Sequence, residues 1–388
     1  MILPMGLQKL TFGGSFNQRL ELQTWPGELE ELTLGDDFNQ PMEKWPILPE
    51  SLKMLTFGKG FNQRLEDISW PKNLKELTLL GFKQSLQKVE FPASLRRLTL
   101  GAFNQSLSEV ILPKELKTLT FGNEFNQSLD GFIFPEHLQH LQFGHKFNQT
   151  LDFINFPFNL ESLAFSGDFD QSLEHVTFPK QLRSLTFGVA FDQSLGNALP
   201  ETLESLTLGA WFSQKLEEIL WPSALETLFL GGLCRNVSQV SWPSHLRNLT
   251  LGDSFNQDLK GVVFPESLET LTFGIQFNHP LEDAILPQGL CSLKLGQQFN
   301  KSLAKVKLPD KLLILILGAN FNQSFDVKLP ESLESLTFGD SFQQSLVNVV
   351  WPLGLQSLTF GRGFQSWTLP TLPSSLRTLF CGGVLMSF

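Results

Sequence analysis

The sequence has 388 residues, 18% of them charged, and a formal net charge of −10. An acidic chain is a poor match to nucleic acid or to an anionic membrane, because both select basic protein faces that hold phosphate groups. The chain holds 37 Phe and no Tyr, so nearly all of its aromatic side chains lack a hydroxyl group and suit a dry interior.

The first residues, MILPMGLQKL, contain neither the charged nor the apolar region of a signal peptide. No later stretch approaches the roughly 18 unbroken apolar residues of a membrane span. Three cysteines, Cys234, Cys291 and Cys381, lie in different repeats, which excludes a disulfide framework and a zinc site of the CxxC type. These features predict a cytoplasmic protein with no membrane partner, no metal and no cofactor.

Proline recurs about every 22 residues along the whole chain, at intervals of 21, 22 or 23 residues. Between the prolines the sequence follows P-x-x-L-x-x-L-T-F/L-G-x-x-F-N-Q-S-L-x-x-V-x-F/L/W. The pattern gives seventeen full copies and a truncated last one, with no linker and no second composition. We therefore expect a single repeat domain over residues 1–388.

Each copy contains one short stretch that is typical of a β-strand. In one copy, Leu119 and Phe121 alternate with Thr118 and Thr120, which places the two pairs on opposite faces. Gly122 then ends the strand, and the proline of the next copy disfavours a helix before it. One copy buries too little apolar surface to offset the entropy of ordering it, so copies have to stack. The sequence predicts a β-rich solenoid: a curved array with one short parallel strand per repeat and mostly non-helical return segments.

The spacing LxxLxF/L at this period is the pattern of leucine-rich repeats. The version LTFGxxFNQ with a terminal proline resembles the FNIP repeat subclass, best known from social amoebae, with similar arrays in dinoflagellates. The resemblance covers essentially the entire chain, although the proline that usually follows FNQ is found only in FNQPM at residues 38–42, and after FNH in FNHPL at residues 277–281. It implies a leucine-rich-repeat fold, and FNIP arrays often accompany F-box or kinase modules, neither of which is seen in this sequence.

The FNQ motif is expected to serve the fold in every copy. Phe fills its first position in sixteen of seventeen copies. Rings stacked at the strand spacing of about 4.8 Å would form a continuous internal spine. Asn fills the second position in ten copies, and its amide can satisfy loop backbone groups and bond to the next copy. The Gln that follows either extends this amide ladder or faces solvent.

Charged side chains are unevenly distributed along the expected outer face of the strands. Basic side chains line consecutive early repeats, at Lys53, Lys75, Arg96, Arg97 and Lys117. Acidic side chains occupy this face further along, at Glu204, Glu226, Glu269 and Glu334. Opposed patches could steer a dipolar partner or another copy of the chain, while a merely solvated surface is the alternative.

One copy breaks the FNQ ladder. After Pro222 the sequence reads LFLGGLCRNV, so that Cys234 and Arg235 replace the usual residues. This break is either a kink or a site, and the sequence favours neither.

A second copy breaks the outer face of the strands. In KLLILILG, residues 311–318, the side chains of Leu313, Ile314 and Ile316 are expected to project from the face that elsewhere carries Glu, Ser and Thr. Lys294 replaces the usual Thr in the preceding copy. An exposed apolar cluster favours a partner site, and the alternatives are sequence drift or contact with a loop or a second copy.

No catalytic arrangement is recognisable, since no nucleophile is paired with a base and no Gly-rich phosphate loop precedes a helix. We therefore expect a non-catalytic scaffold that binds a protein partner on its strand face. A substrate-recognition adaptor for ubiquitin ligation is an alternative that rests on the resemblance. A self-associating structural array is another, because the ends of the array carry no polar caps. The candidate partner-binding residues are Leu313, Ile314, Ile316, Lys294, Lys75 and Arg97.

Overall fold

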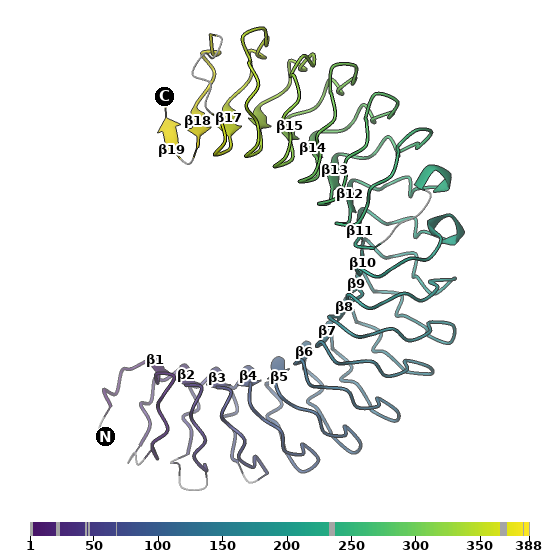
Figure 1. The fold of residues 1–388 in the computed structure, drawn as a ribbon. Coiled ribbons are helices and arrows are strands. Elements are labelled where there is room, and N and C mark those ends of the chain that lie inside the picture. Colours follow the sequence, from purple (N-terminus) through teal and green to yellow (C-terminus); the bar gives the residue numbers. More distant parts are fainter. Residues whose placement is uncertain are drawn as a thin grey trace. The chain divides into compact units, whose positions relative to one another are not determined.

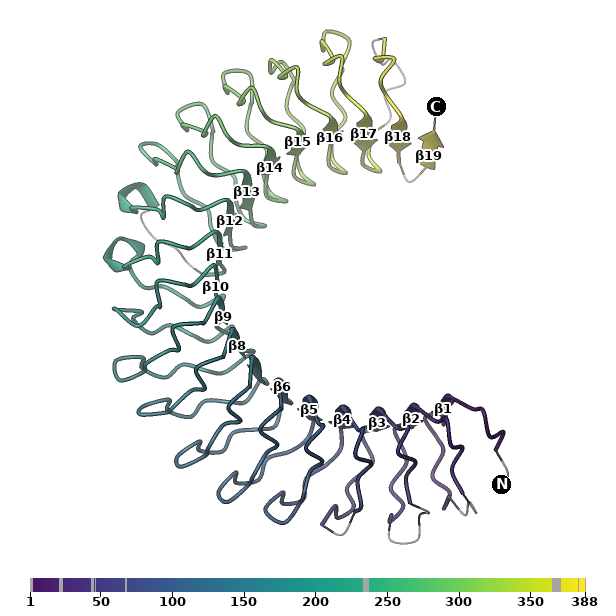
Figure 2. The ribbon, with the colours of Figure 1, turned by 180° about the vertical axis from the view of Figure 1, so that it is seen from behind.

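The sequence repeats fold as stacked coils, each with one short strand. The structure, a computed structural model, describes residues 3–20, 24–42, 45, 47–66, 68–232, 237–364, 371–382 and 384–387. It divides into two units, residues 1–200 (unit 1) and residues 201–388 (unit 2). In each unit the strands line the concave edge and the return segments lie on the opposite side (Figures 1 and 2). The single repeat domain over residues 1–388 stays a prediction.

The strands are three or four residues long. Unit 1 contains β1 (Lys9–Thr11), β2 (Glu31–Leu34), β3 (Met54–Phe57), β4 (Glu76–Leu79), β5 (Arg97–Leu100), β6 (Thr118–Phe121), β7 (His140–Phe143), β8 (Ser162–Phe165) and β9 (Ser184–Thr186). Unit 2 contains β10 (Ser205–Leu208), β11 (Thr227–Leu230), β12 (Asn248–Leu251), β13 (Thr270–Phe273), β14 (Ser292–Lys294), β15 (Ile314–Ile316), β16 (Ser335–Thr337), β17 (Ser357–Phe360), β18 (Thr378–Cys381) and β19 (Val384–Ser387).

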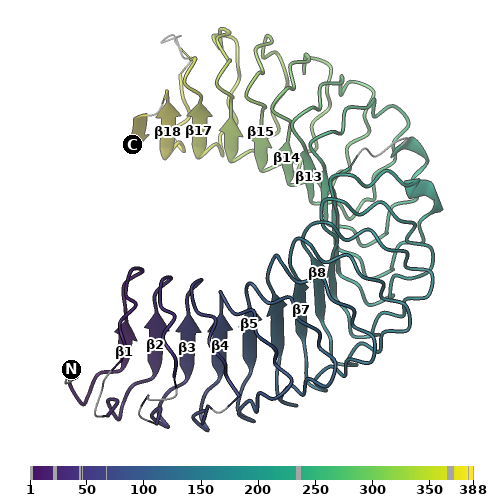
Figure 3. The ribbon, with the colours of Figure 1, turned by 60° about the horizontal axis from the view of Figure 1, so that its bottom comes forward.

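Within each unit, consecutive strands from β1 to β9 and from β10 to β18 pair in parallel and in register. Leu98 of β5 lies opposite Leu119 of β6, which lies opposite Leu141 of β7. The arrows of unit 1 point the same way in Figure 3. This arrangement confirms the predicted β-rich solenoid with one parallel strand per repeat.

Alternation along each strand separates the core from the surface, as predicted. Leu119 and Phe121 of β6 are buried, whereas Thr118 and Thr120 are only half-buried. The same alternation recurs along the array because a strand directs successive side chains to opposite faces. The inward residues therefore make the core, and the outward residues are left for other uses.

Turns bring the chain back to the start of the next strand. In one copy, the N–H of Leu116 donates to the carbonyl of Pro113 at 3.0 Å, and the N–H of Phe132 donates to that of Leu129 at 3.0 Å. The helical elements among the described residues are two 3-10 turns, η1 (Leu216–Glu218) and η2 (Val237–Gln239). The return segments are thus mostly non-helical, in agreement with the proline pattern.

The Phe rings of the FNQ motif form buried stacks, but their spacing differs from the expectation. Ring centroids of successive copies are 5.9–6.4 Å apart, for example 6.0 Å between Phe103 and Phe125. The predicted value of about 4.8 Å is the separation of paired strands. Because the strands lie on the concave edge, neighbouring coils are closest at the strands and further apart towards the return segments. The Phe rings of the FNQ motif, which lie away from the strands, are therefore further apart than the strands are. The strand-borne rings of Phe121 and Phe143, nearer the sheet, are 5.5 Å apart.

The glycine that follows most of the strands is required by packing between copies. A β-carbon added to Gly122 would overlap the carbonyl oxygen of Gly101, and one added to Gly144 would overlap that of Gly122. Sequence reasoning assigned this glycine only to the end of the strand. The structure shows that it also lets neighbouring coils approach closely.

Strand β19 ends the sheet of unit 2 in a way that the repeats do not predict. It pairs with β18 in antiparallel orientation, with Leu379 opposite Met386 and Cys381 opposite Val384. Figure 1 shows it beside β18 at the yellow end of the ribbon. The last parallel strand therefore has a partner on both sides.

Candidate partner-binding face

The outward strand face consists of the side chains that the strands and the residue before each strand direct away from the core. Parallel pairing in register stacks equivalent residues of successive copies into columns. The fold requires only the inward columns to be apolar. Unusual residues in the outward columns therefore carry the information about binding.

An apolar cluster lies on this face in unit 2. Leu313, just before β15, is 37% exposed, and Ile314 on β15 is 39% exposed. Ile316 is half-buried, while Leu315 between the two isoleucines is buried in the core. We call Leu313, Ile314 and Ile316 the β15 cluster. The structure places all three side chains outward.

Polar residues surround the β15 cluster on both sides. Backbone hydrogen bonds place Leu313 between the weakly polar thiol of Cys291 and the carboxylate of Glu334. Register places Ile314 between two serines, Ser292 and Ser335. The cluster is therefore an isolated apolar patch on a hydrophilic surface, which is unusual for a solvated face.

Lys294 lies beside the cluster, opposite Ile316 on the adjacent strand. Its side chain is exposed, and no carboxylate of a described residue lies within ion-pair distance of it. Apolar contact area and an unpaired cation are thus adjacent on the same face.

A shallow groove of about 400 Å³ continues from the cluster across β11 to β15. Register orders the outward residues along it, from Phe229 through Thr250, Thr272 and Lys294 to Ile316. Four glycines that follow the strands also line it: Gly252, Gly274, Gly296 and Gly318. The groove therefore runs between two apolar side chains, Phe229 at one end and Ile316 at the other.

Phe229 was not among the residues predicted to bind a partner. Its side chain is 40% exposed, in a column where other copies carry Thr. The signal was present in the sequence, because Phe in an outward column that favours Thr has no role in the core. Only the register shows that it shares a groove with Ile316.

Basic residues of unit 1 line the outward face from β3 to β6. Arg97 on β5 lies 3.1 Å from the Glu76 carboxylate, and Arg96 lies 3.4 Å from that of Glu115. Lys75 and Lys117 are exposed, and no carboxylate of a described residue pairs with either. The structure therefore separates two predicted site residues: Arg97 is neutralised locally, whereas Lys75 is not.

A basic residue interrupts the acidic patch that was predicted on the strand face. Glu269 forms an ion pair of 2.5 Å with Arg247. Backbone hydrogen bonds place Arg247 between Glu226 and Glu269 in the same outward column. A basic residue thus separates the predicted acidic residues Glu226 and Glu269, and it neutralises Glu269 locally.

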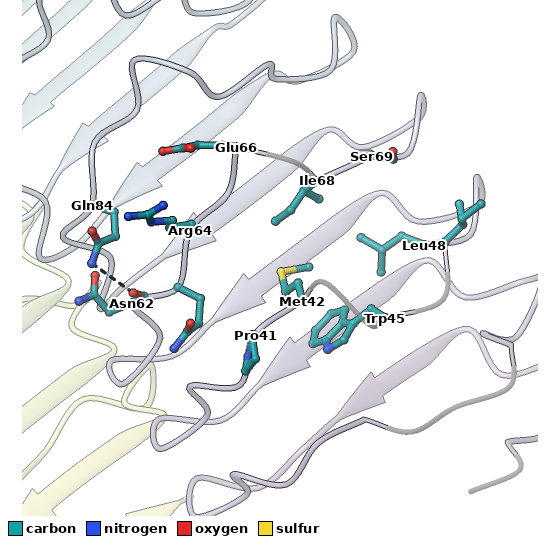
Figure 4. Close-up of a pocket in the computed structure, with 12 residues that line it drawn as sticks. Pro41, Met42, Trp45, Leu48, Asn62, Arg64, Glu66, Ile68, Ser69 and Gln84 are labelled. Carbon is teal, nitrogen blue, oxygen red and sulfur yellow. Dashed lines mark hydrogen bonds between the residues drawn. The ribbon is translucent and has the colours of Figure 1, made fainter.

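A hollow of about 580 Å³ lies away from the strand face, among return segments of unit 1. Figure 4 shows apolar side chains on one side of it, including Met42 and Trp45, and polar side chains on the other, including Arg64 and Glu66. Arg64 and Glu66 are both exposed. The ring N–H of Trp45 is buried without a hydrogen-bond partner, but the charged lining residues are exposed, so the hollow lacks, among its described residues, the several convergent buried polar groups that usually fix a small ligand.

Other kinds of site receive no support from the described residues. No group of three or more His, Cys, Asp or Glu side chains among them could hold a metal ion. None of the helical elements in the described ranges is long and apolar enough to cross a membrane. Cys234 and Arg235, where the ladder breaks, lie outside the described residues.

Comparison with solved structures places the chain among leucine-rich repeat proteins. It is similar to CroV588, described as a novel circular leucine-rich repeat protein, with 34% identity and a TM-score of 0.74 over 97% of this chain and 60% of that one. The chain thus spans three fifths of the length of CroV588. It also resembles YopM from Yersinia enterocolitica WA-314 in fold, with 18% identity and a TM-score of 0.50 over 97% of this chain and 91% of that one. No curated protein matches the sequence.

The FNIP repeat model matches most of the chain, at residues 1–37, 38–81, 82–124, 125–168, 169–210, 238–276, 277–320 and 321–363. These matches confirm the resemblance that the LTFGxxFNQ pattern indicated. The chain is a leucine-rich repeat protein and belongs to the FNIP repeat family.

Proposed function

We propose that this protein is a non-catalytic scaffold that binds a partner protein on the outward strand face of unit 2. The observation that carries the proposal is the β15 cluster, which exposes three branched apolar side chains where the fold needs none. Leucine-rich repeat solenoids are typically used for protein–protein interaction, which also supports a protein-binding scaffold.

The surroundings of the cluster indicate what such a partner presents. Apolar side chains of the partner would cover Leu313, Ile314 and Ile316, and this burial would supply most of the affinity. A carboxylate beside them would pair with Lys294, which no described acidic residue neutralises. We therefore expect an apolar segment flanked by an acidic residue.

The test is affinity capture with the full chain, comparing wild type with the double variant Leu313→Ser, Ile316→Thr. We expect the variant to lose the captured partner, because it removes apolar contact area without touching the core. Its thermal unfolding should change little, since both side chains point outward and a surface substitution usually alters stability by about 0.5 kcal/mol or less. A photo-crosslinking residue at position 314 then identifies the partner by direct contact.

The matched control is the double variant Ile111→Ser, Ile133→Thr, which removes two exposed apolar side chains from return segments of unit 1. It should retain the partner. Retention of the same partner by the Leu313→Ser, Ile316→Thr variant would refute the proposal, and so would loss of folding in that variant.

A further inference from the structure

We propose that a row of basic residues in unit 1 is a docking site for a short, extended, acidic segment of a partner protein. The row consists of Lys53, Lys75, Arg96 and Lys117, and we call it the basic row. The inference rests on the proposed function, in that it names the chemistry of a second contact on the outward strand face.

Backbone hydrogen bonds fix the geometry of the basic row. The N–H of Lys75 donates to the carbonyl of Lys53 at 2.8 Å, that of Arg96 to Lys75 at 2.7 Å, and that of Lys117 to Arg96 at 2.8 Å. Four cations therefore occupy one outward column on four consecutive coils. Successive positions are separated by about 4.8 Å, the spacing of paired strands.

Like charges at this spacing repel one another, and the fold relieves only part of the repulsion. Lys53 pairs with Glu30 at 2.6 Å, and Arg96 pairs with Glu115 at 3.4 Å. Lys75 and Lys117 pair with no carboxylate of a described residue. The two unpaired ammonium groups thus flank Arg96 on the same column, which is an arrangement that an external anion would stabilise.

The surface around the row is polar and slightly hollowed. A depression of about 280 Å³ is lined by Lys75, Glu76, Arg96, Arg97, Lys117, Thr118, Gln139 and His140. Arg97 engages the Glu76 carboxylate at 3.1 Å, so the one acidic residue of the lining is already neutralised. Hydroxyl and amide groups beside the cations can donate to a bound carboxylate.

The distance between Lys75 and Lys117 sets the length of the ligand. Two strand spacings are about 10 Å, and an extended chain advances about 3.3 Å per residue. A segment of roughly three to four residues that crosses the strands would therefore reach both ammonium groups. Acidic side chains at alternate positions would lie on the face that meets them.

The rest of unit 1 favours a peptide over a nucleic acid. Residues 1–200 hold 17 Lys and Arg against 23 Asp and Glu, a formal charge of −6. A phosphate backbone would meet this acidic surface beyond the row, and nucleic-acid affinity depends on many phosphate contacts. A short acidic segment touches the basic row alone.

Binding of a fluorescein-labelled hexaglutamate peptide to the full chain, measured by fluorescence anisotropy at roughly 50 mM salt, tests the proposal. We expect the double variant Lys75→Gln, Lys117→Gln to weaken binding by at least about fivefold. The matched control is Lys83→Gln, Lys88→Gln, which makes the same charge change in unit 1 at exposed residues off the strand face. It should change the affinity by less than about twofold.

Three outcomes would overturn the proposal: no binding of the peptide to the wild type, equal loss in the two double variants, or tighter binding of an oligothymidylate that depends on the same lysines. The last result would identify the row as a nucleic-acid site. The Leu313→Ser, Ile316→Thr variant should bind hexaglutamate as the wild type does. Failure at the β15 cluster and failure at the basic row are therefore distinguishable.

Discussion

At the scale of single residues, the Asn of the FNQ motif joins each coil to the next. Its Oδ1 atom accepts two hydrogen bonds in unit 1: Asn126 accepts from the N–H of Asn148 and from Nε2 of Gln149, both at 2.9 Å. Asp170 accepts in the same way from the N–H of Asp192 and from Nε2 of Gln193, both at 2.9 Å. At these positions the column supplies an acceptor oxygen, and either an amide or a carboxylate can provide it.

We predict that Asn126→Ala destabilises the protein by about 1–3 kcal/mol, because two hydrogen bonds of ordinary net strength are lost together. Asn126→Asp should cost much less, since a carboxylate oxygen can accept both bonds, as that of Asp170 does. Urea unfolding measures the stability, and hydrogen exchange of the Asn148 amide reports the bond directly.

Gln127→Ala is the control for this prediction. It removes one donor to Oδ1 of Asn104, which still accepts from the N–H of Asn126 at 2.9 Å. Its effect should be smaller than that of Asn126→Ala. Equal destabilisation by Asn126→Asp and Asn126→Ala would show that the acceptor oxygen is not what the column requires.

At the scale of one element, β19 is the strand that pairs with the outer edge of β18 in unit 2. A strand edge without a partner offers a row of N–H and C=O groups to other chains. β19 pairs with β18 along four residue pairs, from Thr378 and Ser387 to Cys381 and Val384. The sequence suggested open ends and therefore self-association, whereas this strand covers the edge of the last parallel strand.

We predict that a chain ending at Gly382 self-associates more strongly than the full chain, because it exposes the edge of β18. Sedimentation velocity at tens of micromolar protein, a range in which weak edge contacts are populated, would show the change as heavier species. The control is a chain ending at Ser387, which keeps β19 and should sediment as the full chain does. Identical sedimentation of all three chains would contradict the prediction.

The strands could be predicted from the sequence because each depends on local alternation, as at Leu119 and Phe121. The turns could be predicted because proline and glycine restrict the backbone locally. Features that depend on the packing of one copy against the next could not be predicted from the sequence of a single copy. The overlap that excludes a side chain at Gly122 and the ring spacing near 6.0 Å at Phe125 both follow from coil packing.

The candidate site was predictable to a similar extent. Leu313 and Ile314 were assigned to the outer face because their columns are polar in other copies. The contrast between Arg97 and Lys75 was not predictable, since it depends on whether a carboxylate such as that of Glu76 reaches the cation. Phe229 could be assigned to the site only from the structure, because the register of β11 to β15 places it in the same groove as Ile316.

At the scale of the whole molecule, stability arises from contacts between neighbouring coils. In unit 2, Leu293 of β14 is buried and lies opposite Leu271 of β13 and Leu315 of β15. Because a repeat in a solenoid contacts mainly its neighbours, a local defect should weaken the nearest coils and lose influence with each further coil. The β15 cluster and the basic row lie in different units. A destabilising substitution near one of them should therefore leave the structure of the other unchanged.

We predict that Leu293→Ala, which should cost about 2–5 kcal/mol through the cavity it leaves, lowers amide protection in β13, β14 and β15 and leaves β2 to β5 protected as in the wild type. Hydrogen exchange followed by mass spectrometry of peptides measures the profile. The control Lys294→Ala, at an exposed residue of the same strand, should leave all of these strands protected. A uniform loss of protection across unit 1 as well would show that the array unfolds as one cooperative body, because a defect in one coil would then be shared by all of them.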